Sequence, residues 1–420
     1  MIGESAATAV AAVPAWSADD KEVQRMQQLI TAAHVLVGPA GQRIDDGAVL
    51  VDGDTITAVG PRAEVVPQAG EGARRRDFPA GTVLPGLINS HVHLAFDASL
   101  DAIDNVIDAD DTDLLLGMAG RAQRLLRSGV TTIRDLGDRG AAAVRLRDAV
   151  ERGELDGPRI LAAGPPVTIP RGHCWFFGGE ADGEEEIRRR VRRNAELGVD
   201  VIKVMASGGQ MTPSSPPMWA SQFSTAELAA VTEEAARAGL PVAAHAHGAE
   251  AIASAVEAGV TTIEHCTWLG DGGYDRRDEV AKRMADQGIY ACSTMPPRWR
   301  DFLDRIGPQR AEHVMHRLRW MDELGVQLIT GTDAGVPRSD FDGFPDALGV
   351  YEHLGFDRER IIEMATVTSA AALGVADRVG RLAAGCTADL LAVDGDPVAD
   401  LGALNRRSLV LARGREIPLN

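Results

Sequence analysis

Apolar strands that end in a metal-binding side chain restrict the fold of this chain more than any other feature. The runs VDVIKV, PVAAH and QLITGTD end at or beside Lys203, His245 and Asp333, and helical stretches closed by Gly precede them. Strands that alternate with helices form parallel sheets, and the carboxyl ends of parallel strands meet on one rim. The sequence therefore predicts an α/β fold, a (β/α)8 barrel of the TIM type, with its reactive residues on that rim.

Eight segments supply the strands of such a barrel. Helical patterns such as GEEEIRRRVRRNAELG and STAELAAVTEEAARAG lie between them, with Ser224 and Thr225 as candidate N-caps. The barrel domain is expected to cover residues 81–379. Its predicted strands span residues 82–90, 131–135, 159–163, 201–205, 241–244, 261–264, 289–293 and 327–330.

The two ends of the chain have a different pattern. Residues 28–80 contain short alternating strands separated by Gly and Asp turns, as in DDGAVLVDGDTITAVG, and the same pattern returns over residues 380–420. We expect these two segments to form one small β-sandwich domain outside the barrel. Residues 1–27 are Ala-rich, lack the basic region of a secretory signal and are expected to be a flexible N-terminus.

Composition argues against several classes of partner. The chain has 43 basic and 61 acidic residues, a net charge of −18, which disfavours nucleic acid and anionic membranes because both attract positive surfaces. No stretch approaches the roughly 18 apolar residues of a membrane-spanning helix. The four cysteines lack CxxC spacing and fit reduced thiols, so we expect a cytoplasmic protein.

The first ligand candidates lie on two predicted strands. His91 and His93 flank Val92, and alternate side chains of an extended segment point to the same side, so one cation can bind both imidazoles. A lone His-x-His also occurs as ordinary loop residues. Lys203 lies in a strand that a barrel buries on both faces, where an unpaired ammonium is costly. Either an ion pair or a chemical modification would remove that cost.

Three more segments add ligand candidates. His245 and His247 in AAHAHG alternate to one face of a predicted strand, and His245 follows the apolar run PVAA directly. His265 in TIEHC and Asp333 in TGTDAG end two further strands. An isolated Thr-Asp pair is commonly a cap or a turn, but an acid beside a metal ion can also transfer protons.

The order His-x-His, Lys, His, His, Asp along successive strands resembles that of the metal-dependent amidohydrolase superfamily. Over nearly its whole length the chain is most similar to the prolidase (Xaa-Pro dipeptidase) and imidazolonepropionase-like branch. The resemblance implies two divalent metal ions, with zinc expected, bridged by Lys203 as N6-carboxylysine. One ion would be held by His91, His93, Lys203 and Asp333, and the other by Lys203, His245 and His265.

The same resemblance implies a metallopeptidase-like hydrolase of C–N bonds, a dipeptidase or carboxypeptidase-like amidase that cleaves a dipeptide or an N-acyl amino acid. A hydroxide that bridges the two ions would attack the amide carbonyl, Asp333 would deliver a proton to the leaving amine, and His173 would polarise the carbonyl oxygen. A cyclic amide, lactone or ester is the alternative substrate class. Lys203 argues against a mononuclear deaminase, and the complete ligand set argues against a non-enzymatic scaffold.

Two long loops are the candidate substrate-binding segments. TIPRGHCWFFGGEA follows the third predicted strand, and SGGQMTPSSPPMWASQFS follows the fourth and is long enough to form a lid. Their aromatic and apolar residues would form a wall, and a rim arginine would bind a substrate carboxylate, although any one of them also fits an ordinary loop role. The predicted substrate contacts are His247, Arg171, Trp175, Met218, Trp219 and Arg338. The expected partners are a small-molecule substrate and further copies of the chain in a homo-oligomer.

Overall fold

The parallel strands form two sheets whose edges are bridged. The computed structural model describes residues 27–212 and 214–419. One sheet has the order β5-β6-β7, and the other has the order β13-β12-β10-β9-β8, with the short β11 beside β10. Single parallel bridges join Val92 to Ala334 and Val167 to Val204, so each sheet meets the other at both ends. The bounds are β5 Leu87–Val92, β6 Val130–Asp135, β7 Arg159–Ala162, β8 Ile202–Met205, β9 Val242–Gly248, β10 Thr262–Gly270, β11 Gly273–Tyr274, β12 Tyr290–Thr294 and β13 Leu328–Gly331.

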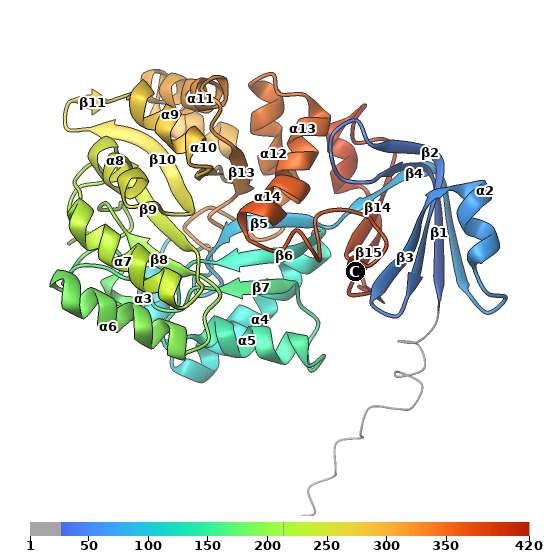
Figure 1. Cartoon of the computed structure of the whole chain (residues 1–420), viewed down its shortest axis with the longest axis horizontal. Coiled ribbons are helices and arrows are strands. Elements are labelled where there is room, and N and C mark those ends of the chain that lie inside the picture. Colours follow the sequence, from blue (N-terminus) through green and yellow to red (C-terminus); the bar gives the residue numbers. More distant parts are fainter. Residues whose placement is uncertain (1–26, 213, 420) are drawn as a thin grey trace, which may run out of the picture.

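Helices follow these strands in the chain and lie around the sheets (Figure 1). Their inner faces are apolar, and Leu125, Val231 and Ile252 on three of them are fully buried. The bounds are α3 Ala102–Asp108, α4 Asp111–Arg127, α5 Ala142–Glu151, α6 Gly183–Glu196, α7 Thr225–Arg237, α8 Ala249–Glu257, α9 Asp278–Asp286, α10 Trp299–Ile306, α11 Pro308–Glu323, α12 Phe344–His353, α13 Arg358–Glu363 and α14 Ser369–Ala372, with the shorter turns η2 Trp175–Phe177 and η3 Met364–Thr368.

Most parallel strands lie where the sequence predicts them. The strands β6, β7, β8, β12 and β13 begin and end within one residue of the prediction, whereas β9 and β10 run several residues longer. Ile202, Val204 and Ile263 are completely buried, as expected for strands covered on both faces. Ser224 caps α7 as predicted, in a reciprocal pair with Glu227, and Thr225 is the first helical residue.

The two ends of the chain meet in a separate sheet, shown at the right of Figure 1. Its order is β16-β15-β14-β4-β1-β2-β3, and β4 pairs with β1 in parallel and with β14 in antiparallel fashion. The bounds are β1 Gln28–Leu36, β2 Arg43–Asp52, β3 Thr55–Pro61, β4 Arg74–Pro85, β14 Leu390–Asp394, β15 Arg407–Ala412 and β16 Arg415–Glu416; the short segments α2 Arg62–Val65, η1 Val66–Gln68 and η4 Leu401–Asn405 connect some of them.

Two predictions about this region need correction. The expected β-sandwich is a single hydrogen-bonded sheet, because the long β4 pairs with strands from both ends of the chain and so joins them. Residues 82–85, predicted to begin the first barrel strand, belong to β4, and the barrel strand begins only at Leu87. The apolar run TVLPGLIN therefore supplies two strands, one to each sheet.

Two further features concern the cysteines and the helix lengths. All four cysteines are free and buried. Within residues 27–212 and 214–419, no helix is both long enough and apolar enough to cross a bilayer.

Candidate active site

His91, His93 and Asp333 meet where β5 and β13 end. The Oδ1 atom of Asp333 lies 3.3 Å from Nε2 of His91 and 3.3 Å from Nε2 of His93. The backbone fixes this approach, because the Asp333 N–H donates to the His91 carbonyl at 2.9 Å. Burial alone would raise the pKa of Asp333, but the adjacent His91, His93 and His265 imidazoles lower it well below its usual value. Asp333 is therefore an ionised carboxylate that faces two imidazoles.

A buried acid sets the orientation of His91. The carboxylate of Glu264 lies 2.7 Å from His91 Nδ1 and accepts a hydrogen bond from the Arg134 guanidinium at 2.7 Å. Burial would raise the pKa of Glu264, but Arg134 and the His91 hydrogen bond lower it below its usual range. Since an ionised carboxylate only accepts, His91 donates to Glu264 from Nδ1, and its Nε2 atom faces Asp333.

Sequence reasoning did not identify Glu264 or Arg134 as functional residues. Both lie within apolar strand runs, TTIEH and TTIRD, where a charged residue is itself a signal because an unpaired buried charge is costly. That the two residues pair across β6 and β10 follows only from the fold.

Replacing Glu264 by Gln should strongly destabilise the protein. The change leaves the Arg134 guanidinium buried without its counter-charge, and removing one partner of a buried ion pair costs about 3–5 kcal/mol. Urea unfolding at equilibrium measures the loss. The control is Glu250→Gln, which removes an exposed pairing with Arg277 and should cost about 0–1 kcal/mol. Equal losses in the two variants would show that the buried network contributes no special stability.

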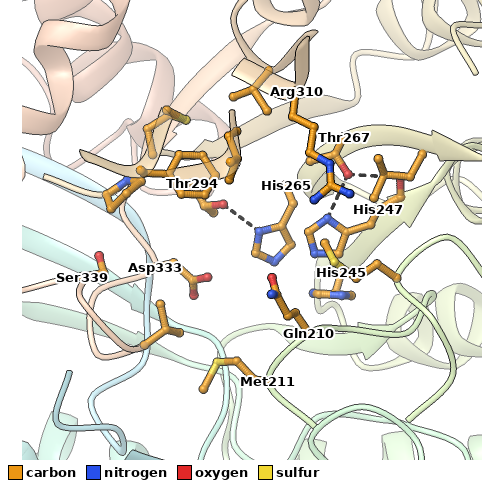
Figure 2. Close-up of a pocket in the computed structure, with 18 of the residues that line it drawn as sticks. Gln210, Met211, His245, His247, His265, Thr267, Thr294, Arg310, Asp333 and Ser339 are labelled. Atoms are coloured by element: carbon orange, nitrogen blue, oxygen red, sulfur yellow. Dashed lines mark hydrogen bonds between the residues drawn. The ribbon is translucent and has the colours of Figure 1, made fainter. Parts of the chain in front are cut away.

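Three imidazoles from β9 and β10 converge beside this group (Figure 2). His245, His247 and His265 each offer a ring nitrogen, and these atoms lie within 4.8 Å of one another. The His265 ring is also centred 5.0 Å from that of His91, which links the two groups. Burial, then the neighbouring histidines, lowers the pKa of His245 and of His265 well below the usual value. These imidazoles are therefore neutral, as metal ligands must be.

Two of the three rings are stacked. The rings of His247 and His265 have 4.5 Å between centroids and 19° between planes, whereas the His245 ring stands at 72° to His265 and at 81° to His247. Ring planes alone therefore leave either stacked imidazole able to share an ion with His245. The 5.0 Å between the ring centroids of His265 and His91 places His265 next to the other ligand candidates, and His247 remains a predicted pocket residue.

Lys203 on β8 is a buried amine that lines the same cavity. Its side chain is among the largest fully buried ones, with 1% of the residue exposed. No carboxylate of the described residues lies within the 4.0 Å that defines an ion pair with its amine. Burial lowers the pKa of Lys203, and the more distant carboxylates of Glu264 and Asp333 offset this only in part. Of the two sequence-based options for Lys203, the direct ion pair is not formed.

His173 lies beside His245. Its ring is centred 4.6 Å from that of His245, and its Nδ1 atom is 3.2 Å from the Thr212 hydroxyl. A Cβ atom at Gly209 would stand 2.3 Å from the His173 ring, so only glycine permits this position. Burial, with a smaller contribution from Lys203, lowers the pKa of His173 to about 3. His173 is therefore neutral in the physiological range.

Two of the predicted ligands have left-handed backbone conformations. The φ angle is 67° at His265 and 57° at Asp333. A non-glycine residue in this region is strained, and such residues cluster at functional sites where the surrounding structure holds them. The strain turns both side chains away from the direction that strand alternation would give them.

A cavity of about 1150 Å³ lies over these residues. Met218, Trp219, Arg338 and His247, predicted to contact substrate, all line it. The residues Gln210 and Met211, from the loop after β8, also line it and lie across it from Arg310 (Figure 2).

Arg171 and Trp175, also predicted substrate contacts, are not in this lining. Both are exposed, because the loop turns at Arg171, where φ is 57°, and η2 directs Phe177 into the core instead.

The donor atoms of this group fit divalent cations. Neutral imidazoles and an ionised carboxylate are the usual ligands of zinc. Asp333 Oδ1 and His93 Nδ1 are buried and have no geometrically acceptable hydrogen-bond partner among the described residues, so their lone pairs and protons are not satisfied by the chain alone. Of the predicted ligands, His91, His245, His265 and Asp333 belong to groups whose ligand atoms lie close enough together to share an ion.

The sequence matches a known protein family over most of its length. The model of the amidohydrolase family matches residues 82–416. A shorter match, to the imidazolonepropionase-like composite domain of bacteria, covers residues 47–69, which lie in the terminal sheet and its α2–η1 connection.

Three individual proteins are similar to this chain over most of its length. Ochratoxinase from Aspergillus niger is 27% identical, over 89% of this chain and 82% of that protein. Imidazolonepropionase from Symbiobacterium thermophilum is 26% identical, over 87% of this chain and 88% of that protein. The solved structure of a Xaa-Pro dipeptidase with methionine bound in its active site superimposes with a TM-score of 0.80 and 28% identity, covering 93% of this chain and 99% of that one. The resemblance inferred from the ligand order is confirmed, and the chain is an enzyme that belongs to the amidohydrolase family.

Proposed function

We propose that the protein hydrolyses the amide bond of a small substrate, a dipeptide or an N-acyl amino acid, at a site for two divalent metal ions. The observation that carries the proposal is the convergence of an ionised carboxylate, neutral imidazoles and an unpaired lysine at the floor of one cavity. When bound, the ions, with zinc expected, supply a hydroxide nucleophile at neutral pH and polarise the carbonyl. The proposed ligands are His91, His93, Lys203 and Asp333 for one ion and Lys203, His245 and His265 for the other.

The chain's own residues perform the proton transfers. Asp333, ionised at neutral pH, accepts a proton during attack and returns it to the nitrogen of the leaving amine. His173 is neutral and stands beside His245, where an N–H can donate to the substrate carbonyl oxygen as negative charge develops. His247 contacts substrate, and Met218 and Trp219 on the loop after β8 exclude water from the bound substrate.

Lys203 is proposed to react with carbon dioxide. Its lowered pKa favours the neutral amine, whose lone pair forms the N–C bond, and the loss of one N–H proton leaves a carbamate anion. The reaction converts the buried amine into an anionic ligand, and divalent ions bound beside it would supply the counter-charge that its burial requires. N6-carboxylysine at this position would therefore complete both proposed ligand sets.

Further proposals concern the molecule as a whole. We infer that the two parallel sheets act as one closed (β/α)8 barrel, since the bridges from Val92 and Val167 link both pairs of edges. The division into residues 28–80 with 380–420 and residues 81–379, the cytoplasmic location and the homo-oligomer remain predictions from the sequence.

Amine release by zinc-loaded protein tests the proposed reaction. The panel contains Xaa-Pro dipeptides, other dipeptides and N-acyl amino acids with aromatic or aliphatic leaving groups. We expect a restricted set of hits, loss of all turnover after chelation and recovery when zinc is added back. Circular dichroism of the chelated protein is the control for unfolding.

The outcome also decides the substrate class. Amide hydrolysis that persists in metal-free protein would contradict the binuclear mechanism. If no compound of the panel releases amine although two ions are bound, the substrate would instead be a cyclic amide, a lactone or an ester, hydrolysed by the same residues.

A further inference from the structure

An arginine without a counter-charge is buried in the wall of the cavity. Arg317 on α11 is 3% exposed and lines the cavity, and no carboxylate of the described residues lies within 4.0 Å of it. Its Nη1 donates to the Val314 carbonyl at 2.6 Å, its Nη2 reaches the His265 carbonyl at 3.5 Å, and its Nε has no partner in the described chain. Buried charges in proteins are normally paired. The missing partner is therefore expected to come from a molecule in the cavity.

A second arginine lies on the same face of the same helix. Arg310 is seven residues, or two helical turns, before Arg317, and residues with this spacing share a face. Arg310 also lines the cavity, and Figure 2 shows its guanidinium extending toward Thr267 and His247. Within the described chain it forms no ion pair by the 4.0 Å criterion. The two guanidinium groups thus border the part of the cavity next to His247.

The charge of the cavity wall is opposite to that of the chain. Apart from Asp333, the acidic lining residues are Asp271 and Asp301. The arginines of the lining are Arg298, Arg305, Arg310, Arg317 and Arg338. The whole chain carries a net charge of −18, so a basic wall is a local feature and attracts anions into this cavity.

We propose that Arg317 and Arg310 form a subsite for the carboxylate of the substrate. The guanidinium group matches a carboxylate in shape and can donate two parallel hydrogen bonds to it. The inference rests on the proposed function and adds to it the residues that bind the free carboxylate of the amide substrate, on the side that reaches His247. The C-terminal carboxylate of a dipeptide and the carboxylate of an N-acyl amino acid both meet this requirement.

A purely structural role for Arg317 makes a different prediction. If its guanidinium only holds the carbonyls of Val314 and His265, its loss changes stability and leaves the choice between charged and neutral ligands as it was. Arg310 donates no such backbone hydrogen bond in the described chain and is exposed, so its replacement should leave the fold intact. A comparison of charged and neutral ligands therefore separates the two roles.

Calorimetry of metal-loaded protein with 3-phenylpropionate and its neutral analogue 3-phenylpropanamide tests the subsite without turnover. We expect the carboxylate to bind at least about tenfold more tightly than the amide, as for hydrogen bonds to a charged group. Arg317→Gln and Arg310→Gln should each remove most of this preference and leave amide binding unchanged. The matched control is Arg319→Gln on the same helix, since the Arg319 guanidinium lies over the Phe356 ring and outside the cavity lining.

Equal binding of the two ligands by the wild type would overturn the proposal. The proposal would also fail if Arg310→Gln and folded Arg317→Gln, each with both metal ions bound, kept the full preference for the carboxylate over the amide. The carboxylate would then bind elsewhere, for example on the metal ions. If Arg317→Gln does not fold, the comparison of the two ligands in Arg310→Gln alone tests the proposal. An arginine-dependent preference in a protein that cleaves no amide would support the subsite and refute the proposed reaction, so the two failures are distinguishable.

Discussion

Asp333→Asn should retain the fold and most of the bound metal but lose nearly all turnover. The amide keeps an oxygen beside His91 and His93, so the contacts at 3.3 Å remain possible, but it cannot accept and return a proton. Removal of a positioned proton-transfer group lowers kcat by about 10²–10⁴-fold. Steady-state kinetics with the best amide substrate, together with metal analysis of the same sample, measure both quantities.

The control for this variant is Asp377→Asn, an acid whose side chain is 78% exposed. It makes the same chemical change far from the cavity and should behave as wild type. Turnover near the wild-type level in Asp333→Asn would remove the proton-transfer role. If turnover in Asp333→Asn falls only in proportion to its metal content, Asp333 acts as a metal ligand and not in proton transfer.

The strand framework was predictable because local apolar patterns encode it. Runs such as TTIRD and VIKVM are too short for helices and are followed closely by Gly, so β6 and β8 were located within one residue. The first barrel strand was not, because the mostly apolar segment TVLPGLIN was read as one strand across its Pro-Gly pair, and the division at Gly86 depends on which sheet each half joins. Strand pairing is a property of the whole chain, and the run alone does not contain it.

The side chains that meet at the cavity floor were predictable as a set, but their directions were not. Strand ends place His91, His245 and Asp333 on one rim once the barrel is assumed. The left-handed backbone at His265 and Asp333 breaks the alternation from which a side-chain direction would be read. The prediction for Arg171 and Trp175 relied on their loop alone, and the loop's turn directs both to solvent.

Arg317 shows a further limit of sequence reasoning. In HVMHRLRWM it resembles any other helical arginine, and nothing local separates it from Arg319 two residues later. Its importance follows from burial and the absence of a nearby carboxylate in the described chain, which are both tertiary properties. A rim loop was the reasonable place to seek a carboxylate partner, but the structure offers a helix face.

Lys203→Ala should bind fewer than two metal ions and lose activity. The variant lacks the only proposed ligand that both ions share, and the loss of even an outer-shell partner lowers metal affinity by about 10–100-fold. Metal stoichiometry after dialysis and turnover of the best amide substrate measure the effect. Two tightly bound ions in this variant would contradict the carbamate bridge.

The chain is well suited to a direct test of the carbamate, because it contains only three lysines, Lys21, Lys203 and Lys282. Protein prepared with ¹³C-bicarbonate should show a carbamate resonance that persists in Lys282→Ala, whose lysine is exposed, and disappears in Lys203→Ala. Urea unfolding of the metal-free proteins separates stability from ligation. Lys203 has no carboxylate within 4.0 Å in the described chain, so its removal leaves no uncompensated partner, unlike the loss of Glu264 beside Arg134. The difference in unfolding between metal-free Lys203→Ala and metal-free wild type therefore measures the packing lost with this buried side chain, and the metal lost by the folded variant reports on ligation.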